Sequence, residues 1–566
     1  MKPYTKRAIL FLLLIAVLLA ACGSAATMEE TQPIAVERPR DESNQAPITS
    51  YESAEDGDTE VSTSETTVTE QVYEEVVVET EESLDAASEA APSGYMEPLP
   101  PVATAAPDIV MVPRPAATPS AMFFEEYGVN PYILTEVDNL STFSLDVDTG
   151  SYSIARRYLQ DGLMPPPEAI RVEEFVNSFD QGYQIPPNTA FAVYADGAPS
   201  PFHTDGTYFL RIGVQGFESS EEVRPSANLV FVIDVSGSMA QENRLGLVKQ
   251  SLEILVDRMR ADDTIAIVVY GSDARVVLTP TNGSDRRTIM RAINSLETEG
   301  STNLEAGLLL GYQMANLAYK SEGINRVILA SDGVANVGNT SADGIAAQIR
   351  GYADSGIQLT TIGFGLGNYN DVMMEQLADQ GDGNYGYIDT LQEAETLFVD
   401  NIMSTLQVIG LDAKIQVEFD RNVVQQYRLI GYENRAIADE DFRNDTIDAA
   451  EFGAGHTAAA IYAVQLVPGA QGRIATVNLR WQDPDTRVVK EINGVFTTEN
   501  LSRSFDEAPL HYQLAVVVSQ YAELLRNSYW VEGVNMRDLQ IRAERLASQM
   551  NDEAIWELAS LISYSR

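Results

Sequence analysis

Residues 228–238, NLVFVIDVSGS, carry most of the information on the fold of this 566-residue chain. Leu229–Ile233 is a continuous apolar run, which is typical of a strand buried on both faces of a parallel sheet. Asp234, Ser236 and Ser238 follow at once, in a short loop made flexible by a glycine. Ligands bind beyond the carboxyl ends of such strands, so this loop is the first candidate for a site.

Strands and helices alternate from this run to about residue 406. Apolar runs predict further strands, and amphipathic spacing predicts helices between them. The predicted strands are 264–270, 274–278, 326–330, 358–364 and 385–388, and the predicted helices include 244–259, 285–296 and 304–317. Such alternation favours an α/β fold with a doubly wound, mostly parallel sheet of the Rossmann-like kind.

The regions on either side follow another pattern. Period-two strands are predicted at 191–194 and 208–214 before the α/β region, and at 411–419, 426–432, 458–466, 473–481 and 488–496 after it. Helices are predicted at 152–160, 168–179, 510–525, 536–550 and 553–563. We hypothesise that the two groups of strands pair in one β-sandwich, into which the α/β domain is inserted.

Composition excludes several classes of protein. The 83 acidic residues outnumber the 37 basic ones, for a net charge of −46, so we expect no nucleic-acid partner. The single cysteine excludes an intramolecular disulfide and Cys-rich zinc or iron–sulfur sites. With only three histidines, an oxygen-ligand site for Mg²⁺ or Ca²⁺ suits the chain better than a transition-metal centre.

The N-terminus indicates export. Three basic residues precede the apolar run Ile9–Ala21, which is the pattern of a signal peptide. The run ends Leu-Ala-Ala before Cys22, which resembles a bacterial lipobox; the alternative is an ordinary secretory signal with an incidental cysteine. We therefore expect lipidation at Cys22 and an extracytoplasmic protein, lipid-anchored to the bacterial cell membrane or outer membrane.

The expected organisation has six parts. After the signal peptide comes an acidic stretch with 22 acidic and three basic residues, rich in Thr, Ser and Pro, which predicts a disordered stalk. The predicted boundaries are 1–22 signal peptide, 23–125 linker, 126–226 N-terminal segment, 227–406 α/β domain, 407–500 β-rich domain and 501–566 helical region.

Three loops at one sheet edge offer oxygen ligands. Thr302 lies in a loop that opens a helix, and Asp332 follows a later strand. Together with Asp234, Ser236 and Ser238 they make five oxygen-bearing side chains, which hard divalent cations prefer. Mg²⁺ is the preferred ion, with Mn²⁺ or Ca²⁺ as alternatives.

These residues resemble the metal-ion-dependent adhesion site of the von Willebrand factor type A domain. The spacings, 302 − 234 = 68 and 332 − 302 = 30, are of the usual size for that domain. The resemblance implies that Ser236, Ser238 and Thr302 contact the metal, with Asp234 and Asp332 close by, often through water. It also implies an open position on the metal that an Asp or Glu of a protein partner fills.

The flanking regions extend the resemblance to bacterial lipoproteins that contain this domain. Residues 141–180 resemble the segment that precedes the domain in those proteins, and residues 429–456, with Gly-Tyr-Glu-Asn-Arg at 431–435, resemble their C-terminal domain. The similarity covers most of residues 126–566 and implies an architecture. The flanking domains have no assigned activity.

Two further acidic motifs have alternative interpretations. Residues 146–150, DVDTG, faintly resemble a calcium loop but fail the EF-hand pattern, so a helix-capping turn is the preferred interpretation. Residues 439–448 hold Asp439, Glu440, Asp441, Asn444, Asp445 and Asp448. A solvated loop is the default here, and a second Ca²⁺ site is the alternative.

Enzyme motifs are lacking. Asp234 and Ser236 stand where a Gly-x-Ser-x-Gly elbow would need other residues, and neither a Walker A sequence nor His-Glu-x-x-His occurs. The leading hypothesis is a surface-anchored, non-enzymatic binding protein, tethered to the membrane by its lipid and holding a protein partner through the metal. The alternative is an envelope scaffold or assembly factor in which the metal organises a complex.

Overall fold

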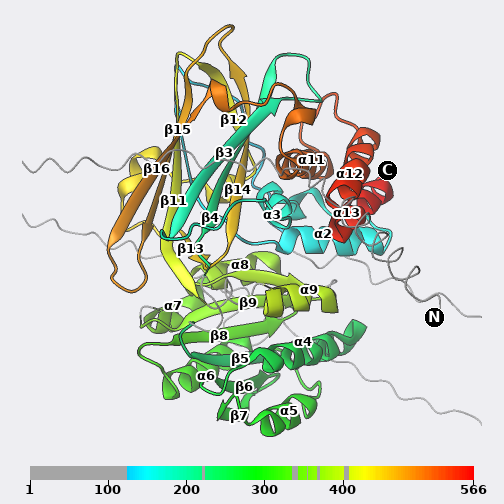
Figure 1. Cartoon of the computed structure of the whole chain (residues 1–566). Helices are drawn as coiled ribbons and strands as arrows, with labels where there is room; N and C mark the ends of the chain where they lie inside the picture. Colours follow the sequence, from blue (N-terminus) through cyan, green and yellow to red (C-terminus); the bar gives the residue numbers. More distant parts are fainter. Residues whose placement is uncertain (1–123, 219–223, 334–341, 354, 366–369, 401–406) are drawn as a thin grey trace, which may run out of the picture. The chain divides into compact units, whose positions relative to one another are not determined.

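A computed structural model describes residues 124–566, apart from 219–223, 334–341, 354, 366–369 and 401–406 (Figure 1). The predicted signal peptide with Cys22, nearly all of the predicted stalk and the predicted end of the last α/β helix near residue 406 lie outside the described residues. Among the described helices, none combines the length and the apolar character that a membrane crossing needs.

The α/β domain is built on a six-stranded sheet of order β10-β9-β8-β5-β6-β7. The strands are β5 (Ala227–Asp234), β6 (Thr264–Tyr270), β7 (Ala274–Asn282), β8 (Ile324–Ser331), β9 (Gln358–Phe364) and β10 (Tyr385–Ile388). All neighbouring pairs are parallel except β6 and β7. The mostly parallel sheet is therefore confirmed.

Helices cover both faces of this sheet, as Figure 1 shows. They are α4 (Arg244–Arg258), α5 (Arg286–Asn294), α6 (Leu304–Leu317), α7 (Ala342–Ala353), α8 (Asp371–Asp379) and α9 (Leu391–Glu395). Leu229 and Phe231 of β5 pack in one core with α4, whereas Val230 and Val232 pack in another with α6. Burial of both faces explains why β5 is apolar throughout rather than alternating.

The β-sandwich draws its strands from both sides of the α/β domain. One sheet has the order β1-β12-β14-β4-β3, and the other has the order β13-β11-β15-β16 with β2 beside β11. The strands before the insertion are β1 (Ile133–Leu134), β2 (Leu140–Ser144), β3 (Phe191–Pro199) and β4 (Thr207–Gly216). Those after it are β11 (Val408–Phe419), β12 (Val424–Ile430), β13 (Ala450–Gly453), β14 (Thr457–Leu466), β15 (Arg473–Gln482) and β16 (Val489–Thr497).

Antiparallel pairing between β4 and β14 joins the two halves, with Ile212 opposite Ala460. Apolar side chains of both sheets share one core, in which the ring of Phe191 lies 4.8 Å from that of Trp481. The hypothesis of one sandwich with an inserted α/β domain is therefore confirmed. The short strands β1, β2 and β13 were not predicted, because too few residues alternate in them to give a period-two signal.

A third layer of helices packs on the outer face of the β14-containing sheet. It consists of α2 (Gly150–Gln160), α3 (Val172–Asn177), α11 (Leu510–Leu525), α12 (Met536–Met550) and α13 (Glu553–Tyr564). Ala459, Ile461 and Ala463 of β14 share a core with these helices. The alternate residues of β14 therefore face two different cores, which explains why this strand is apolar almost throughout.

Candidate metal site

The first loop of the site follows β5 directly. Asp234 is fully buried, and its Oδ1 accepts a hydrogen bond from the backbone N–H of Ser236 at 2.8 Å. The hydroxyl oxygens of Ser236 and Ser238 lie 3.0 Å apart. The alternate residues of this loop therefore converge as the sequence predicts, with one carboxylate oxygen already engaged in shaping the turn.

The loop after β8 lies beside it because β5 and β8 are neighbours in the sheet, with Ile233 opposite Ala330. The hydroxyl of Ser331, the last residue of β8, donates to Oδ2 of Asp234 at 3.1 Å. The next residue, Asp332, is fully buried as well. The two predicted aspartates thus reach the same sheet edge from adjacent parallel strands.

The loop before α6 closes over the first loop through its backbone. The N–H of Glu299 donates to the carbonyl of Val235 at 2.5 Å, and the N–H of Gly237 donates to the carbonyl of Gly300 at 3.3 Å. Gly300 has a φ of 73°, which a side chain would disfavour. Two residues further on, Thr302 is only 2% exposed. All three predicted loops are therefore at one edge.

The electrostatics of the two aspartates are unfavourable without a cation. Burial and the neighbouring Asp332 carboxylate raise the pKa of Asp234 to about 7. Burial also raises the pKa of Asp332. The hydroxyl of Ser238 and the guanidinium of Arg244 oppose this rise in pKa but do not cancel it. Carboxylates that repel each other in a buried place favour the binding of a positive charge between them.

Arg244 is the member of this site that the sequence did not reveal. It begins α4, and its Nη1 lies 2.9 Å from Oδ2 of Asp332. The other oxygen of Asp332, Oδ1, is buried and has no hydrogen-bond partner among the described residues. That orphaned oxygen, together with the hydroxyls of Ser236 and Ser238, makes an all-oxygen donor set that fits a hard divalent cation.

The DVDTG motif at 146–150 has a different role from the one predicted. Thr149 precedes α2 without capping it by its side chain, so the interpretation as a helix-capping turn is wrong. Asp148 instead lies 3.2 Å from the guanidinium of Arg435 and accepts a hydrogen bond from the N–H of Tyr385 at 3.2 Å. The motif therefore joins the flanking region to the α/β domain.

Arg435, the last residue of the Gly-Tyr-Glu-Asn-Arg sequence, centres this interface. Its guanidinium lies 3.1 Å from Glu375 and 3.1 Å from Asp379, both on α8. Arg171, just before α3, pairs with Glu375 at 2.7 Å and with Asp371 at 2.8 Å. The α/β domain and the sandwich belong to one compact unit, and buried ion pairs hold them together.

Family models match three consecutive regions of the chain. A von Willebrand factor model matches residues 118–210, the von Willebrand factor type A domain matches 228–400, and the model described as uncharacterized protein YfbK, C-terminal, matches 404–474. The second match contains all five residues of the candidate site. The first covers β1 to β3 and the start of β4, and the third covers β11 to β14, so the two matches include strands from both sides of the insertion.

Curated relatives show the same relation. The chain is 40% identical to the uncharacterized protein YfbK of Escherichia coli (strain K12) over 382 residues, which are 66% of each chain. It is 32% identical over 177 residues to the human inter-alpha-trypsin inhibitor heavy chain H3, covering 29% of this chain and 19% of that one. The chain thus spans 66% of the first relative's length and much less of the second's.

A solved structure of a von Willebrand factor type A protein from Catenulispora acidiphila matches 66% of this chain and 89% of its own, at 16% identity and a TM-score of 0.38. The family assignment does not depend on it, because the sequence matches cover the α/β domain and both flanks. The chain therefore belongs to the bacterial von Willebrand factor type A domain proteins, with that family's N-terminal segment and C-terminal domain around the inserted α/β domain.

Proposed function

We propose that this protein binds a protein partner through a divalent metal held by Asp234, Ser236, Ser238, Thr302 and Asp332. Domains of this family are generally protein-interaction modules, and the proposal adds the metal as the point of contact. Mg²⁺ is the preferred ion because it is bound in proteins by a few carboxylate and hydroxyl oxygens and keeps its other positions for water or a ligand. An Asp or Glu of the partner would take one of those positions.

The observation that carries the proposal is the imbalance of charge at the sheet edge. Two buried carboxylates lie there, and within the described part of the chain their ion pairs amount to that of Arg244 with Asp332. A bound Mg²⁺ would leave a net positive charge at this edge, which would attract an acidic side chain. The metal is all the more necessary because the whole chain carries a net charge of −46.

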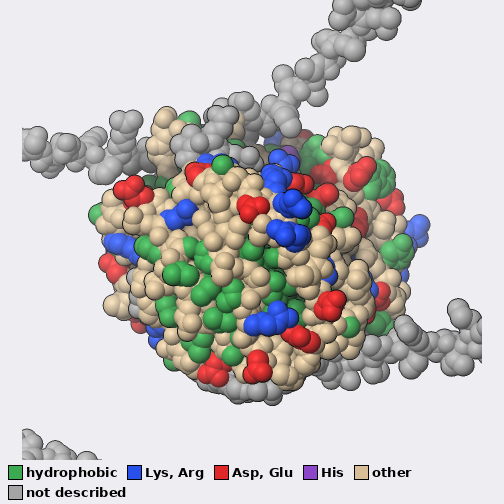
Figure 2. All heavy atoms as spheres, turned by 90° about the horizontal axis from the view of Figure 1, so that it is seen from below, with side chains coloured by type: hydrophobic (Ala, Val, Ile, Leu, Met, Phe, Trp, Pro, Cys, Tyr) green, Lys and Arg blue, Asp and Glu red, His purple; other side chains and the backbone are tan. Residues whose placement is uncertain are grey.

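The surface around the α/β domain agrees with recognition at one point rather than by a broad charged face. In Figure 2, which views the molecule from the α/β side, Lys/Arg and Asp/Glu side chains are interspersed around an apolar area. Such a face does not attract acidic partners over its whole extent. We therefore assign the recognition of the acidic side chain to the metal, and we propose no enzymatic activity.

The location belongs to the proposal as well. We propose that a diacylglycerol-modified Cys22 anchors the chain to the bacterial cell membrane or outer membrane, on the extracytoplasmic side. A single lipid anchor gives reversible membrane attachment, and an acidic stretch of about 100 residues would give the folded part reach from the surface. Labelling with a lipid precursor tests this point, because Cys22→Ala should lose the label.

A pull-down from membranes tests the mechanism. The purified chain should retain a partner in Mg²⁺, release it in EDTA, and fail to retain it as the Thr302→Val variant. Ser301→Ala is the matched control, because Ser301 is an exposed hydroxyl residue in the same loop. Retention that survives both EDTA and Thr302→Val would contradict the proposal. Retention of several envelope proteins together would instead favour the scaffold alternative.

A further inference from the structure

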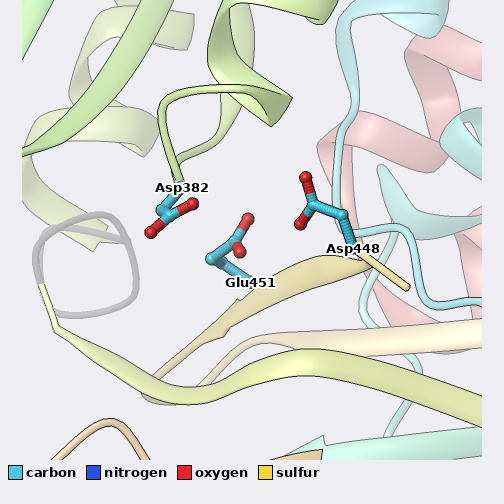
Figure 3. Close-up of side chains that lie close together, drawn as sticks. All are labelled: Asp382, Asp448 and Glu451. Carbon is cyan, nitrogen blue, oxygen red and sulfur yellow. The ribbon is translucent and has the colours of Figure 1, made fainter. Parts of the chain in front are cut away.

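A second group of carboxylates meets between the α/β domain and the β-sandwich. Asp382 comes from the loop between α8 and β10, Asp448 from the chain just before β13, and Glu451 from β13 itself. One oxygen of each lies within 4.8 Å of one from each of the others. Figure 3 shows Glu451 between the two aspartates, so residues almost 70 positions apart in sequence converge on one point.

Glu451 is the residue that requires an explanation. It is 5% exposed, and no hydrogen bond or ion pair within the described part of the chain includes its carboxylate. Burial, with the neighbouring carboxylates of Asp382 and Asp448, raises its pKa well above the usual range. A buried carboxylate without a donor costs several kcal/mol unless a proton or a cation neutralises it.

Three basic side chains of the surroundings make their hydrogen bonds with other groups. Arg326 donates to Thr360 at 2.6 Å and to Gln358 at 2.7 Å. Lys414 donates to the carbonyl of Asn444 at 2.8 Å, and Arg350 donates to Gln380 at 3.3 Å. Among the ion pairs of the described residues, none includes Asp448 or Glu451. The charges of Arg350 and Arg326 act on Asp448 and Glu451 from beyond ion-pair distance, so neither carboxylate has a direct basic partner in the described part of the chain.

Other acidic residues of the 439–448 loop are engaged in separate contacts. Asp439 accepts a hydrogen bond from Thr142 at 2.5 Å, Asp441 accepts one from Asn444 at 2.9 Å, and Asp445 pairs with Arg480 at 2.5 Å. The second Ca²⁺ site in this loop, the alternative that the sequence left open, stays a prediction. Of these aspartates, Asp448 is the one that meets Asp382 and Glu451.

The place has room for an ion and its water. A cavity of about 260 Å³ lies beside Glu451, and Asp382, Asp412 and Asp448 line it together with Arg350. A water molecule occupies about 30 Å³ in the liquid, so several fit beside an ion. Asp448 is the exposed member of the three and Glu451 the buried one, so the group reaches from the surface into the interior.

We propose that Asp382, Asp448 and Glu451 form a calcium site that joins the α/β domain to the β-sandwich. The donors are all carboxylate oxygens, and Ca²⁺ accepts six to eight such ligands, mono- or bidentate, in irregular geometry, with water completing the shell. Mg²⁺ fits less well because it demands a near-ideal octahedron. The site precedes β10, at the opposite edge of the parallel sheet from Asp234, so it is independent of the proposed partner-binding metal.

Equilibrium dialysis of the full chain against calcium tests the site. To remove the first site from the count, the measurement uses the Asp234→Asn variant. This variant should bind one Ca²⁺ per chain, and adding Glu451→Gln or Asp448→Asn should lower the affinity at least ten-fold. Glu440→Gln, an exposed acid in the neighbouring loop, is the matched control. Unchanged binding in both variants would overturn the proposal.

Thermal unfolding distinguishes a bound ion from a protonated carboxyl group. In EDTA, Glu451→Gln should raise the Tm, because it removes an unbalanced buried carboxylate. In millimolar Ca²⁺ the Tm of the parent chain should rise, and that of the variant should not. If Ca²⁺ leaves the parent unchanged and Glu451→Gln lowers the Tm in both buffers, Glu451 is a protonated structural residue and the proposal is wrong.

Discussion

The molecule buries carboxylates at its domain interface and at its proposed metal sites, and the two groups differ in how they pair with arginines. At the interface, Arg171 and Arg435 lie within hydrogen-bond distance of Glu375, and each pairs with further acids. At the sheet edge, Arg244 pairs with Asp332, and neither Asp234 nor Glu451 has an ion pair among the described residues. The acids of the interface share two arginines, so each of them has an ion pair. At Asp234 and Glu451 we propose that a cation from solution takes the place of the arginine.

The largest effect is expected from removing the central arginine of the interface. Arg435→Met should cost about 3–5 kcal/mol of unfolding free energy, because it leaves the buried Asp148 without its ion pair and leaves Arg171 as the remaining arginine on Glu375. Urea unfolding of the purified chain measures it. A loss below about 1 kcal/mol would mean that the interface does not depend on its arginine.

Metal removal probes the other region. Mg²⁺ at a hundred times its Kd should stabilise the chain by about 2.7 kcal/mol, because only the folded state assembles the site. Asp234→Ala should abolish this gain, because it removes a carboxylate of the site together with the acceptor of the Ser236 N–H and the Ser331 hydroxyl. Thermal scans with and without Mg²⁺ give both numbers. An equal Mg²⁺ response in the variant would contradict the assignment.

A smaller effect is expected from a buried base. Burial, followed by the charge of Arg326, lowers the pKa of His456 to about 4. Between pH 6.5 and about 4, His456 binds a proton in the unfolded chain but not in the folded chain. The contribution of its neutral ring to stability is therefore complete above pH 6.5 and is lost as the pH falls.

The loss should be of the order of 1–2 kcal/mol and should be absent in His456→Gln. Urea midpoints at pH 7.5 and pH 5 measure it, with His203→Gln as the control. If the parent and His456→Gln lose the same stability on acidification, the ring is accessible to protons in the folded state.

The smallest effect concerns an ion pair in water. Arg443, 64% exposed at its side chain, lies 2.7 Å from Glu491. Arg443→Ala should change the unfolding free energy by less than about 1 kcal/mol, because solvent screens the pair. It is the natural reference for Arg435→Met in the same urea experiment. A comparable loss in both variants would show that burial is not what distinguishes the interface.

Elements with a strong local signal were predicted closely. The helices 304–317, 510–525 and 536–550 and the strands 264–270, 358–364 and 385–388 have the predicted bounds. Their signal is the periodic spacing of apolar residues, which can be read from each segment by itself. The meeting of the three loops that carry the five candidates was also predictable, because the carboxyl ends of parallel strands lie at one sheet edge and the loops follow those strands. Their role as metal ligands stays a prediction.

Other features depend on contacts between distant residues. Arg244 reaches Asp332 across 88 positions, and Arg435 reaches Asp148 across 287. The short strand β2 is held by β11, with Ser144 opposite Lys414. An arginine or a five-residue segment gives no local sign of the partner that it will meet, so none of these contacts was predicted.

The chain's local pattern was thus enough to establish the doubly wound α/β domain, the halves of the sandwich and the oxygen-rich edge. The spacing of apolar residues and the succession of strands and helices along the chain can both be read from the sequence. That the strands before and after the inserted domain form one sandwich was a hypothesis, and the pairing of β4 with β14 confirmed it. Which carboxylates receive an arginine and which are left without one emerged from the folded arrangement alone. Charge balance in the interior depends on distances between segments, and sequence order does not contain those distances.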